Sequence, residues 1–365
     1  AARAAIEEPL PASGDDDAEF RQYLADDPDL AGYPELYALF TPDVRRTLLE
    51  DRTLRPVFLE AVPTEPMTVL DRAGLDRAQA AGGIAGDEDF LRRFAVVRVG
   101  DAARASQLHG EGRRLFVGVV DRKDTRHGLT YEVANGRSVL FQLPDRTWIL
   151  VKGAGQMVDD HLPPYNAGSE NRHGLMEQEE ADAVVAALEG GWQAQGRFAQ
   201  ALGYCRLTRV PDGAGGFYAA DTLWHPDETA LEPVLMFFRV ASPHRLIKLP
   251  QLLEADPGLE RMLPRLAEAM AALGTRPRGE PLTAAQLMLE IARAMGRNEG
   301  VKARHGWTKI SIHDQDIGVG TEEHDSSEFV RLDSPWLSRP CIGLAPGPNG
   351  SPLRRPSGVL PVCLP

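Results

Sequence analysis

Cysteine is scarce in this chain of 365 residues: there are three, Cys205, Cys341 and Cys363. They lie far apart and form neither a C-x-x-C pair nor an even-numbered framework. This pattern excludes a disulfide-stapled scaffold and argues against a structural zinc site. Scattered thiols are typical of a reducing compartment, so we expect a cytoplasmic protein.

Long apolar runs and excess positive charge are also missing. No stretch of 18 apolar residues and no basic-then-apolar leader is visible, so we expect no membrane span, no secretory signal and no membrane partner. The formal net charge is −13 and the pI about 5.2. An acidic surface repels phosphate backbones, which disfavours nucleic acid as a partner but is compatible with a local basic cleft for one nucleotide.

Two hydrolase signatures are absent. Without a G-x-S-x-G elbow, a serine hydrolase is disfavoured. His305 and His313 stand near Asp314, Asp316 and His324, a set compatible with zinc. The lack of H-E-x-x-H and C-x-x-C motifs nevertheless argues against metal-dependent hydrolysis.

The length and the 43% hydrophobic content are sufficient for one large bilobal domain or two ordinary ones. Hydrophobic periodicity and turn signals predict a small antiparallel sheet over about 115–152, two further strands and a helical second half. The expected helices are 34–40, 43–49, 54–61, 87–94, 177–202 (interrupted at 190–191), 259–273 (kinked at Pro264) and 283–295 (capped by Thr283); the expected strands are 115–120, 131–133, 138–143, 147–152, 205–210, 234–240, 317–319 and 329–332. This order indicates an α+β fold rather than alternating βαβ units.

We divide the chain into four parts on this basis. Residues 1–100 are expected to form an N-terminal helical extension, 101–240 a sheet-containing lobe and 241–340 a helical lobe. Residues 341–365 are rich in Pro and Gly and are expected to form a tail without a regular core.

Lys152 is the most informative residue, because the chain contains five Lys against 35 Arg. It ends an apolar strand and precedes Gly-Ala-Gly. A compact ammonium at this position suits a phosphate or a tight ion pair, held by an acidic partner such as Glu180 or Glu177 on the next helix. The alternative is a strand-end Lys that extends to water.

Other cations surround the expected strands. Gly136 and Arg137 follow Asn135 in a tight turn, whose backbone N–H groups could face phosphate oxygens, although Asn-Gly is also a common hairpin turn. Arg239 ends a strand that is otherwise apolar, and Arg245 follows shortly after. A buried cation needs an anion, so Arg239 is expected to bind a nucleotide phosphate or to pair with a helix Glu.

Three aspartates could supply acid–base and metal chemistry. Asp316 opens the apolar segment 317–319, and Asp333 closes the segment 329–332. Carboxylates at the ends of two short strands are hard oxygen ligands suited to Mg²⁺, with Asp314 as the candidate base. The alternative is an acidic turn of ordinary surface residues.

Three segments carry a family resemblance. Residues 135–137 (Asn-Gly-Arg) resemble Gly-Asp-Gly-Arg, and 151–155 (Val-Lys-Gly-Ala-Gly) resemble Leu-Lys-Gly-Ala-Gly. Residues 238–245 (Phe-Arg-Val-Ala-Ser-Pro-His-Arg) resemble Thr-Arg-Val-Ala-Pro-Ser-His-Leu-Arg. These are motifs of the selenoprotein-O family of kinase-like protein adenylyltransferases, and the chain resembles a divergent member over about residues 115–335.

The resemblance implies a bilobal protein-kinase-like fold, with a small antiparallel-sheet N-lobe and a mainly helical C-lobe. It implies that Gly136, Arg137, Lys152, Arg239 and Arg245 bind ATP and that AMP is transferred to a hydroxyl of a protein or peptide acceptor, with Mg²⁺ or Mn²⁺ as cofactor.

The catalytic segment departs from the family. It is longer after His305, Gln315 falls at the base position if Asp316 is the metal ligand, and the family's Asp-Tyr-Gly becomes Asp333-Ser334-Pro335. Phosphotransfer, glutamylase-type ligation and an inactive nucleotide-binding or interaction module are therefore the alternative functions.

Overall fold

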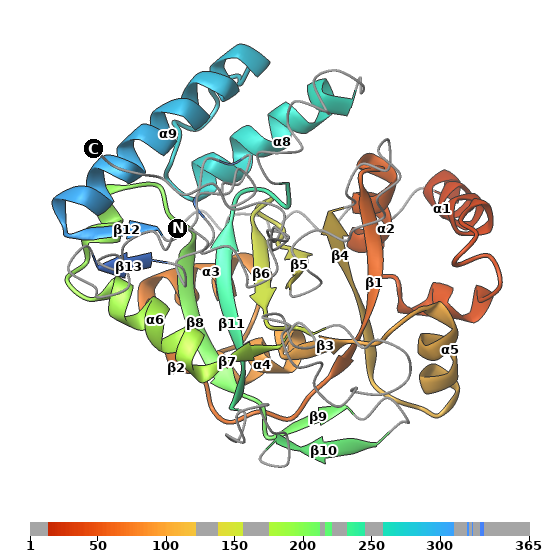
Figure 1. Cartoon of the computed structure of the whole chain (residues 1–365). Helices are drawn as coiled ribbons and strands as arrows, with labels where there is room; N and C mark the ends of the chain where they lie inside the picture. Colours follow the sequence, from red (N-terminus) through yellow and green to blue (C-terminus); the bar gives the residue numbers. More distant parts are fainter. Residues whose placement is uncertain are drawn as a thin grey trace, which may run out of the picture.

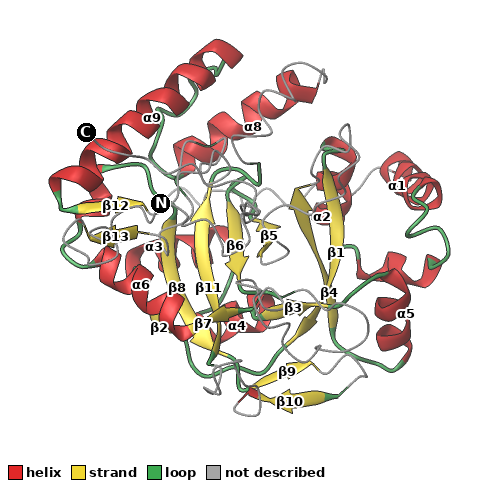
Figure 2. Cartoon of the chain, viewed as in Figure 1, coloured by secondary structure: helices red, strands yellow, loops and turns green. Residues whose placement is uncertain are grey.

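The computed structural model describes residues 14–121, 138–155, 175–211, 216–220, 232–244, 258–309 and 329–331, together with Gly320 and Glu323. Its centre is a nine-stranded sheet in which every described strand pair is antiparallel (Figures 1 and 2). The strand order is β2-β8-β11-β6-β5-β4-β1-β3, and β7 pairs with β11. The strands are β1 (Leu54–Ala61), β2 (Thr68–Val69), β3 (Val96–Arg98), β4 (Leu115–Asp121), β5 (Ser138–Gln142), β6 (Trp148–Lys152), β7 (Met176–Glu177), β8 (Gln200–Arg206) and β11 (Pro233–Val240).

The two faces of the sheet are buried in separate apolar clusters. Side chains alternate along a strand, so Leu150 and Met236 belong to one cluster and Ile149 and Phe237 to the other. We call these the first face and the second face. All eight residues of β11 are buried, as expected for a central strand covered on both sides.

Helices from different parts of the chain cover each face. The cluster of the first face includes side chains of α1 (Gly14–Asp26), the 3₁₀ helix η1 (Pro34–Leu39), α2 (Pro42–Glu50), α5 (Ala102–Gly110) and α6 (Gln178–Leu188). The second face packs against α3 (Arg72–Gly82) and α4 (Asp87–Phe94). Another 3₁₀ helix, η5 (Trp192–Gln195), connects α6 to β8.

The described residues 258–309 are mainly helical. Helices α8 (Gly258–Ala272) and α9 (Ala284–Arg304) lie next to each other (Figure 1). They share their own apolar cluster. Two small two-stranded sheets complete the described part: β9 (Arg209–Pro211) with β10 (Phe217–Ala219), and β12 (Trp307–Lys309) with β13 (Phe329–Arg331). No helix in the described ranges has both the length and the apolar content to cross a membrane.

The expected α+β class is confirmed, as are the strands at 115–120, 138–143, 147–152, 234–240 and 329–332, within one or two residues at their ends. Thr283 caps α9 through an interaction of its hydroxyl with the Gln286 N–H, 3.2 Å, and Pro264 lies inside α8. Helix α9 runs nine residues beyond the expected end at 295. The expected strands 131–133 and 317–319 lie outside the described residues.

The helix expected over 54–61 is wrong, because these residues form β1. The strand pairs with β4 along its length, from Leu54 opposite Asp121 to Glu60 opposite Leu115. Such long-range pairing overrides a short, ambiguous apolar pattern. Strand β3 was also not anticipated, so the first hundred residues are not wholly helical: they supply β1, β2 and β3 to the sheet.

The helix expected over 177–202 is also too long. Helix α6 ends at Leu188, and Gly190 and Gly191 follow with positive φ angles of 82° and 64°. Glycine adopts this left-handed backbone without a steric penalty, which stops the helix. The chain then enters β8 at Gln200.

Candidate functional site

Lys152 ends β6, a central strand between β5 and β11, as the sequence predicts. It lies opposite Ser138 on one side and Met236 on the other, so it points to the first face. Its exposed fraction is 8%. Burying a charge at this level requires a compensating anion or strong hydrogen bonding, which is compatible with the expected phosphate or ion-pair role.

The glycines after Lys152 are required by close packing. Gly153 has a φ of 89°, and a Cβ placed there would lie 2.5 Å from the carbonyl oxygen of Val234 and 2.7 Å from the Cβ of Met176. The carbonyl of buried Ala154 accepts a hydrogen bond from the Arg98 N–H at 2.8 Å. The Gly-Ala-Gly motif therefore fixes how the chain leaves β6 beside β7 and β3.

Arg98 is a buried cation that the sequence reasoning overlooked. It is 4% exposed, and its Nη2 donates to the carbonyl oxygen of Ser138 at 2.7 Å. Ser138 lies opposite Lys152, so two basic side chains approach the same end of β5 and β6. The signal was present in the sequence, because Arg98 interrupts the apolar run 96–99 as Arg239 interrupts 234–240.

The structure brings an acidic helix start to this end of β6. Glu177 and Glu180 form a capping box at the N-terminus of α6, where the Glu177 N–H donates to Oε2 of Glu180 at 3.2 Å. Met176, the residue before Glu177, packs against Gly153. The two glutamates expected to serve Lys152 thus begin the helix next to it, with a structural role of their own.

Arg239 does not share a face with Lys152. It lies opposite Ile149 on β6 and therefore points to the second face. It is 2% exposed; its Nε donates to Oγ1 of Thr147 at 3.1 Å, and its Nη2 pairs with the carboxylate of Asp145. The anion beside Arg239 is thus an aspartate of the β5–β6 turn.

The other candidates lie outside the described residues: Gly136, Arg137, Arg245, Asp314, Asp316 and Asp333. The described neighbours of the aspartates are β12 and β13, whose register places Lys309 opposite Phe329, and β13 contacts α6. Within the described residues, no group of three or more His, Cys, Asp or Glu side chains could hold a metal ion.

A buried polar network surrounds Glu323, which lies between β12 and β13 in the sequence. Glu323, 3% exposed, accepts from Nζ of Lys302 at 2.9 Å through Oε1 and from Nδ2 of Asn298 at 3.2 Å through Oε2. Its backbone N–H donates to the carbonyl of Arg197, and its carbonyl accepts from Ala199. Glu323 therefore joins α9 to the start of β8, and no sequence motif had marked it.

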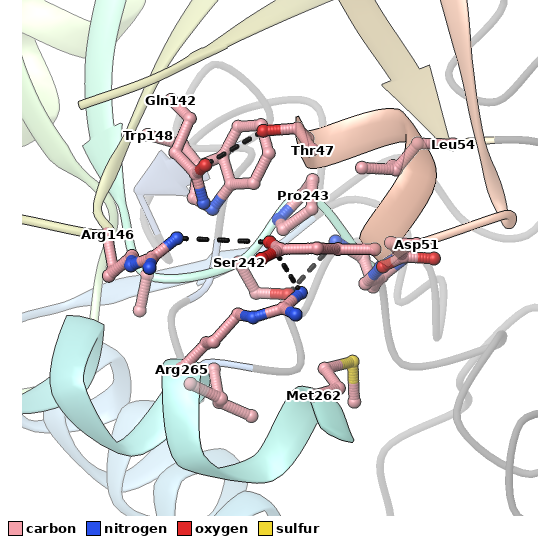
Figure 3. A pocket seen from close by; sticks show the side chains of 14 residues that line it. Thr47, Asp51, Leu54, Gln142, Arg146, Trp148, Ser242, Pro243, Met262 and Arg265 are labelled. Carbon is pink, nitrogen blue, oxygen red and sulfur yellow. Dashed lines mark hydrogen bonds and ion pairs between the residues drawn. The ribbon is translucent and has the colours of Figure 1, made fainter. Parts of the chain in front are cut away.

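A pocket lies on the first face at the opposite end of β6 from Lys152 (Figure 3). Trp148 and Gln142 line it from the sheet and Arg146 from the β5–β6 turn. The C-terminal end of α2 lines a second side, and Arg265 and its neighbours on α8 line a third. Oε2 of Glu50 on α2 pairs with Nη1 of Arg265 at 3.1 Å and lies 3.9 Å from Nη1 of Arg146.

Arg146 has an unusual backbone. Its φ of 69° is the one positive value among the described residues other than glycine. Residues other than glycine pay a steric cost of order 1–3 kcal/mol when φ is positive, and residues with this strained backbone concentrate at functional sites. The turn thus delivers a guanidinium to the pocket at the expense of backbone strain.

His244, from the family-like segment 238–245, is anchored next to this pocket. Its Nε2 lies 2.7 Å from Oδ2 of Asp51, and the ring is 1% exposed. Burial would raise the pKa of Asp51, but the charge and hydrogen bond of His244, together with hydrogen bonds from Thr53, hold that pKa well below its usual range. The pair ties the end of α2 to the exit of β11.

No protein-family model matches the chain, and no curated protein matches it significantly.

Proposed function

We propose that this protein is an ATP-dependent nucleotidyltransferase that transfers AMP to a hydroxyl of a protein or peptide and uses Mg²⁺ or Mn²⁺. The observation that carries the proposal is the burial of Lys152 at the end of a central strand, with a glycine exit and an acidic helix start beside it. These are the parts that hold an α- or β-phosphate in kinase-like folds.

The first face of β6 offers a path for a nucleotide. Lys152 and Trp148 both point to this face, and the four-residue rise between them corresponds to about 13 Å of strand. The pocket of Figure 3 begins at Trp148. A nucleotide laid along β6 would contact Lys152 through a phosphate and reach toward the pocket with its other end.

Each residue then has a defined task. Lys152 neutralises charge that develops on the α-phosphate, and Glu180 or Glu177 orients its ammonium. Asp316 and Asp333 would hold the metal ion, and Asp314 would accept the hydroxyl proton. Gly136, Arg137 and Arg245 would contact the phosphates. Arg239, which faces the other side of the sheet, contributes by fixing the β5–β6 turn through Asp145.

Labelled ATP separates this reaction from its alternatives. With Mg²⁺ or Mn²⁺ and a protein acceptor, we expect transfer of label from α-³²P-ATP and not from γ-³²P-ATP, and loss of transfer in Lys152→Met. Arg209→Gln is the matched control, since Arg209 is exposed and does not line the pocket of Figure 3.

Other outcomes would point elsewhere. Transfer of γ-label would indicate a phosphotransferase, and AMP release that depends on added glutamate would indicate a ligase. A thermal shift with ATP and Mg²⁺ that Lys152→Met abolishes, without any transfer, would indicate a nucleotide-binding module. If no label is transferred and ATP with Mg²⁺ causes no thermal shift, the proposal is contradicted.

A further inference from the structure

A second, larger cavity lies between α3, the connection from α6 to β8, and the C-terminal end of α8. Its volume is about 670 Å³. Small residues create this room: Gly191, Ala194 and Gly196 line one side, and Ala271, Ala272 and Gly274 line another. From the central sheet, Arg239 of β11 and Gln200 and Ala201 of β8 line the cavity. Arg239 and Gln200 lie opposite each other and point to the second face, away from Lys152. Leu70, Leu188 and Ala201 belong to the cluster of the first face, so the cavity lies at the edge of both clusters, where β8 begins and β11 ends.

The side chains that line this cavity are mainly basic, although the chain as a whole is acidic. Three arginines line it, Arg77, Arg197 and Arg239, against one carboxylate, Asp71. The chain as a whole carries −13. Asp145, which lies outside the lining, offsets the charge of Arg239. The remaining local balance is positive, and a concave, partly apolar surface strengthens such a field.

The Asp71 carboxylate is committed to the protein itself. Its Oδ1 accepts from the Gly74 N–H at 2.8 Å and caps α3, while its Oδ2 accepts from Nε2 of Gln200 at 2.7 Å. Arg77 lies one turn further along the same helix, is exposed, and forms no ion pair with any described residue. Its guanidinium is therefore available to an anion that enters the cavity.

Gln193 provides an independent observation. This lining residue is 8% exposed, and its Nε2 forms no hydrogen bond within the described part of the chain. A buried amide N–H without an acceptor costs free energy, and most such groups in native proteins are satisfied. An acceptor oxygen of a ligand would satisfy it.

The apolar lining defines the rest of the ligand. Leu70, Leu188, Phe198 and Leu273 come from four separate segments and surround the polar groups. Ligand sites commonly combine such an apolar wall with a few convergent polar groups.

From these observations we propose that the second cavity binds a small organic anion. Its phosphate or carboxylate oxygens would bind Arg77 and the Gln193 amide, and its apolar body would lie against the leucines. This site goes beyond the proposed nucleotide site, and its lining contains neither Lys152 nor any residue of the pocket of Figure 3, so either can fail without the other.

Isothermal titration with phenyl phosphate tests the proposal, because this probe combines an anionic group with an apolar body. Phenylacetate tests whether the anionic group can be a carboxylate. Inorganic phosphate lacks the apolar body, and phenol lacks the anionic group. We expect phenyl phosphate or phenylacetate to bind more tightly than inorganic phosphate or phenol. A charge-assisted hydrogen bond corresponds to about a tenfold change in Kd, so Arg77→Gln should weaken binding by about that factor.

Two further variants complete the test. Gln193→Met keeps the size of the side chain but removes the amide, and is expected to weaken binding severalfold; Arg209→Gln should bind as the wild type does. If neither organic anion binds wild type, or if Arg77→Gln and Gln193→Met both retain wild-type affinity, the proposal is overturned. Equal weakening in Arg77→Gln and Arg209→Gln would show general charge attraction and would also overturn it.

Discussion

Replacing Glu323 with Gln should destabilise the protein far more than replacing Glu299 with Gln, although both carboxylates bind the same ammonium. Nζ of Lys302 lies 2.9 Å from Oε1 of Glu323 and 2.6 Å from Oε1 of Glu299. Distance alone would rank Glu299 first. Burial reverses the order, because the Glu323 side chain is 3% exposed and that of Glu299 is 51% exposed.

The expected magnitudes follow from solvation. Removing one partner of a buried ion pair costs about 3–5 kcal/mol, because the other charge stays buried. For Glu323→Gln we expect the low end, about 3 kcal/mol, since Glu299 still offsets the charge of Lys302. An exposed pair contributes about 0–1 kcal/mol, which is our expectation for Glu299→Gln.

Urea denaturation at pH 7 gives the free energy of unfolding for each variant. Adding Lys302→Met and the double variant Lys302→Met/Glu323→Gln completes a cycle, and we expect a coupling energy of at least about 2 kcal/mol. If Glu323→Gln is no more destabilising than Glu299→Gln, the reasoning from burial is refuted.

Three further variants test other features. Gly153→Ala should lower the free energy of unfolding by more than about 2 kcal/mol, because its Cβ would meet a β11 carbonyl at 2.5 Å; a neutral effect by urea denaturation would contradict the close packing. The Arg146→Gly variant should be about 1 kcal/mol more stable than Arg146→Ala, because glycine adopts a φ of 69° without steric strain and alanine does not. Urea denaturation would contradict this reasoning if the Ala variant were the more stable of the two. Asp51→Asn should be destabilising at pH 7. The pKa of Asp51 is lowered in the fold, so its contribution is present above the unfolded pKa of about 4 and is lost as pH falls below it. The difference in Tm between wild type and Asp51→Asn should therefore shrink between pH 5 and pH 3, and a constant difference would exclude this linkage.

The parts of the fold that sequence predicts well are those with a strong local signal. The strand ending at Lys152 is apolar throughout and bounded by turns, and the Thr283 capping box marks the start of α9. The strand β1 is different, since Arg55, Pro56 and Glu60 break its apolar pattern. It is a strand because β4 lies beside it, and that partner is 55 to 67 residues away along the chain.

In the candidate site, too, features with a local sequence signal were predicted, and features that depend on long-range pairing were not. Sequence located Lys152 and the acidic start of α6, which the fold brings to neighbouring positions. It could not show that Arg239 points to the other face, because that depends on the pairing register with β6. Because the chain contains few lysines, the sequence drew attention to Lys152. Lys302 belongs to the same small group and is more deeply buried, at 1% exposure against 8% for Lys152.

The seven-residue ladder between β1 and β4 has a practical consequence. A shortened chain starting near residue 100 would leave the backbone N–H and C=O groups of β4 unpaired along a newly created sheet edge, and such edges recruit other chains and drive aggregation. Expression of the lysine- and aspartate-bearing part alone should therefore yield insoluble material, and biochemical work needs the chain from before Leu54 onward.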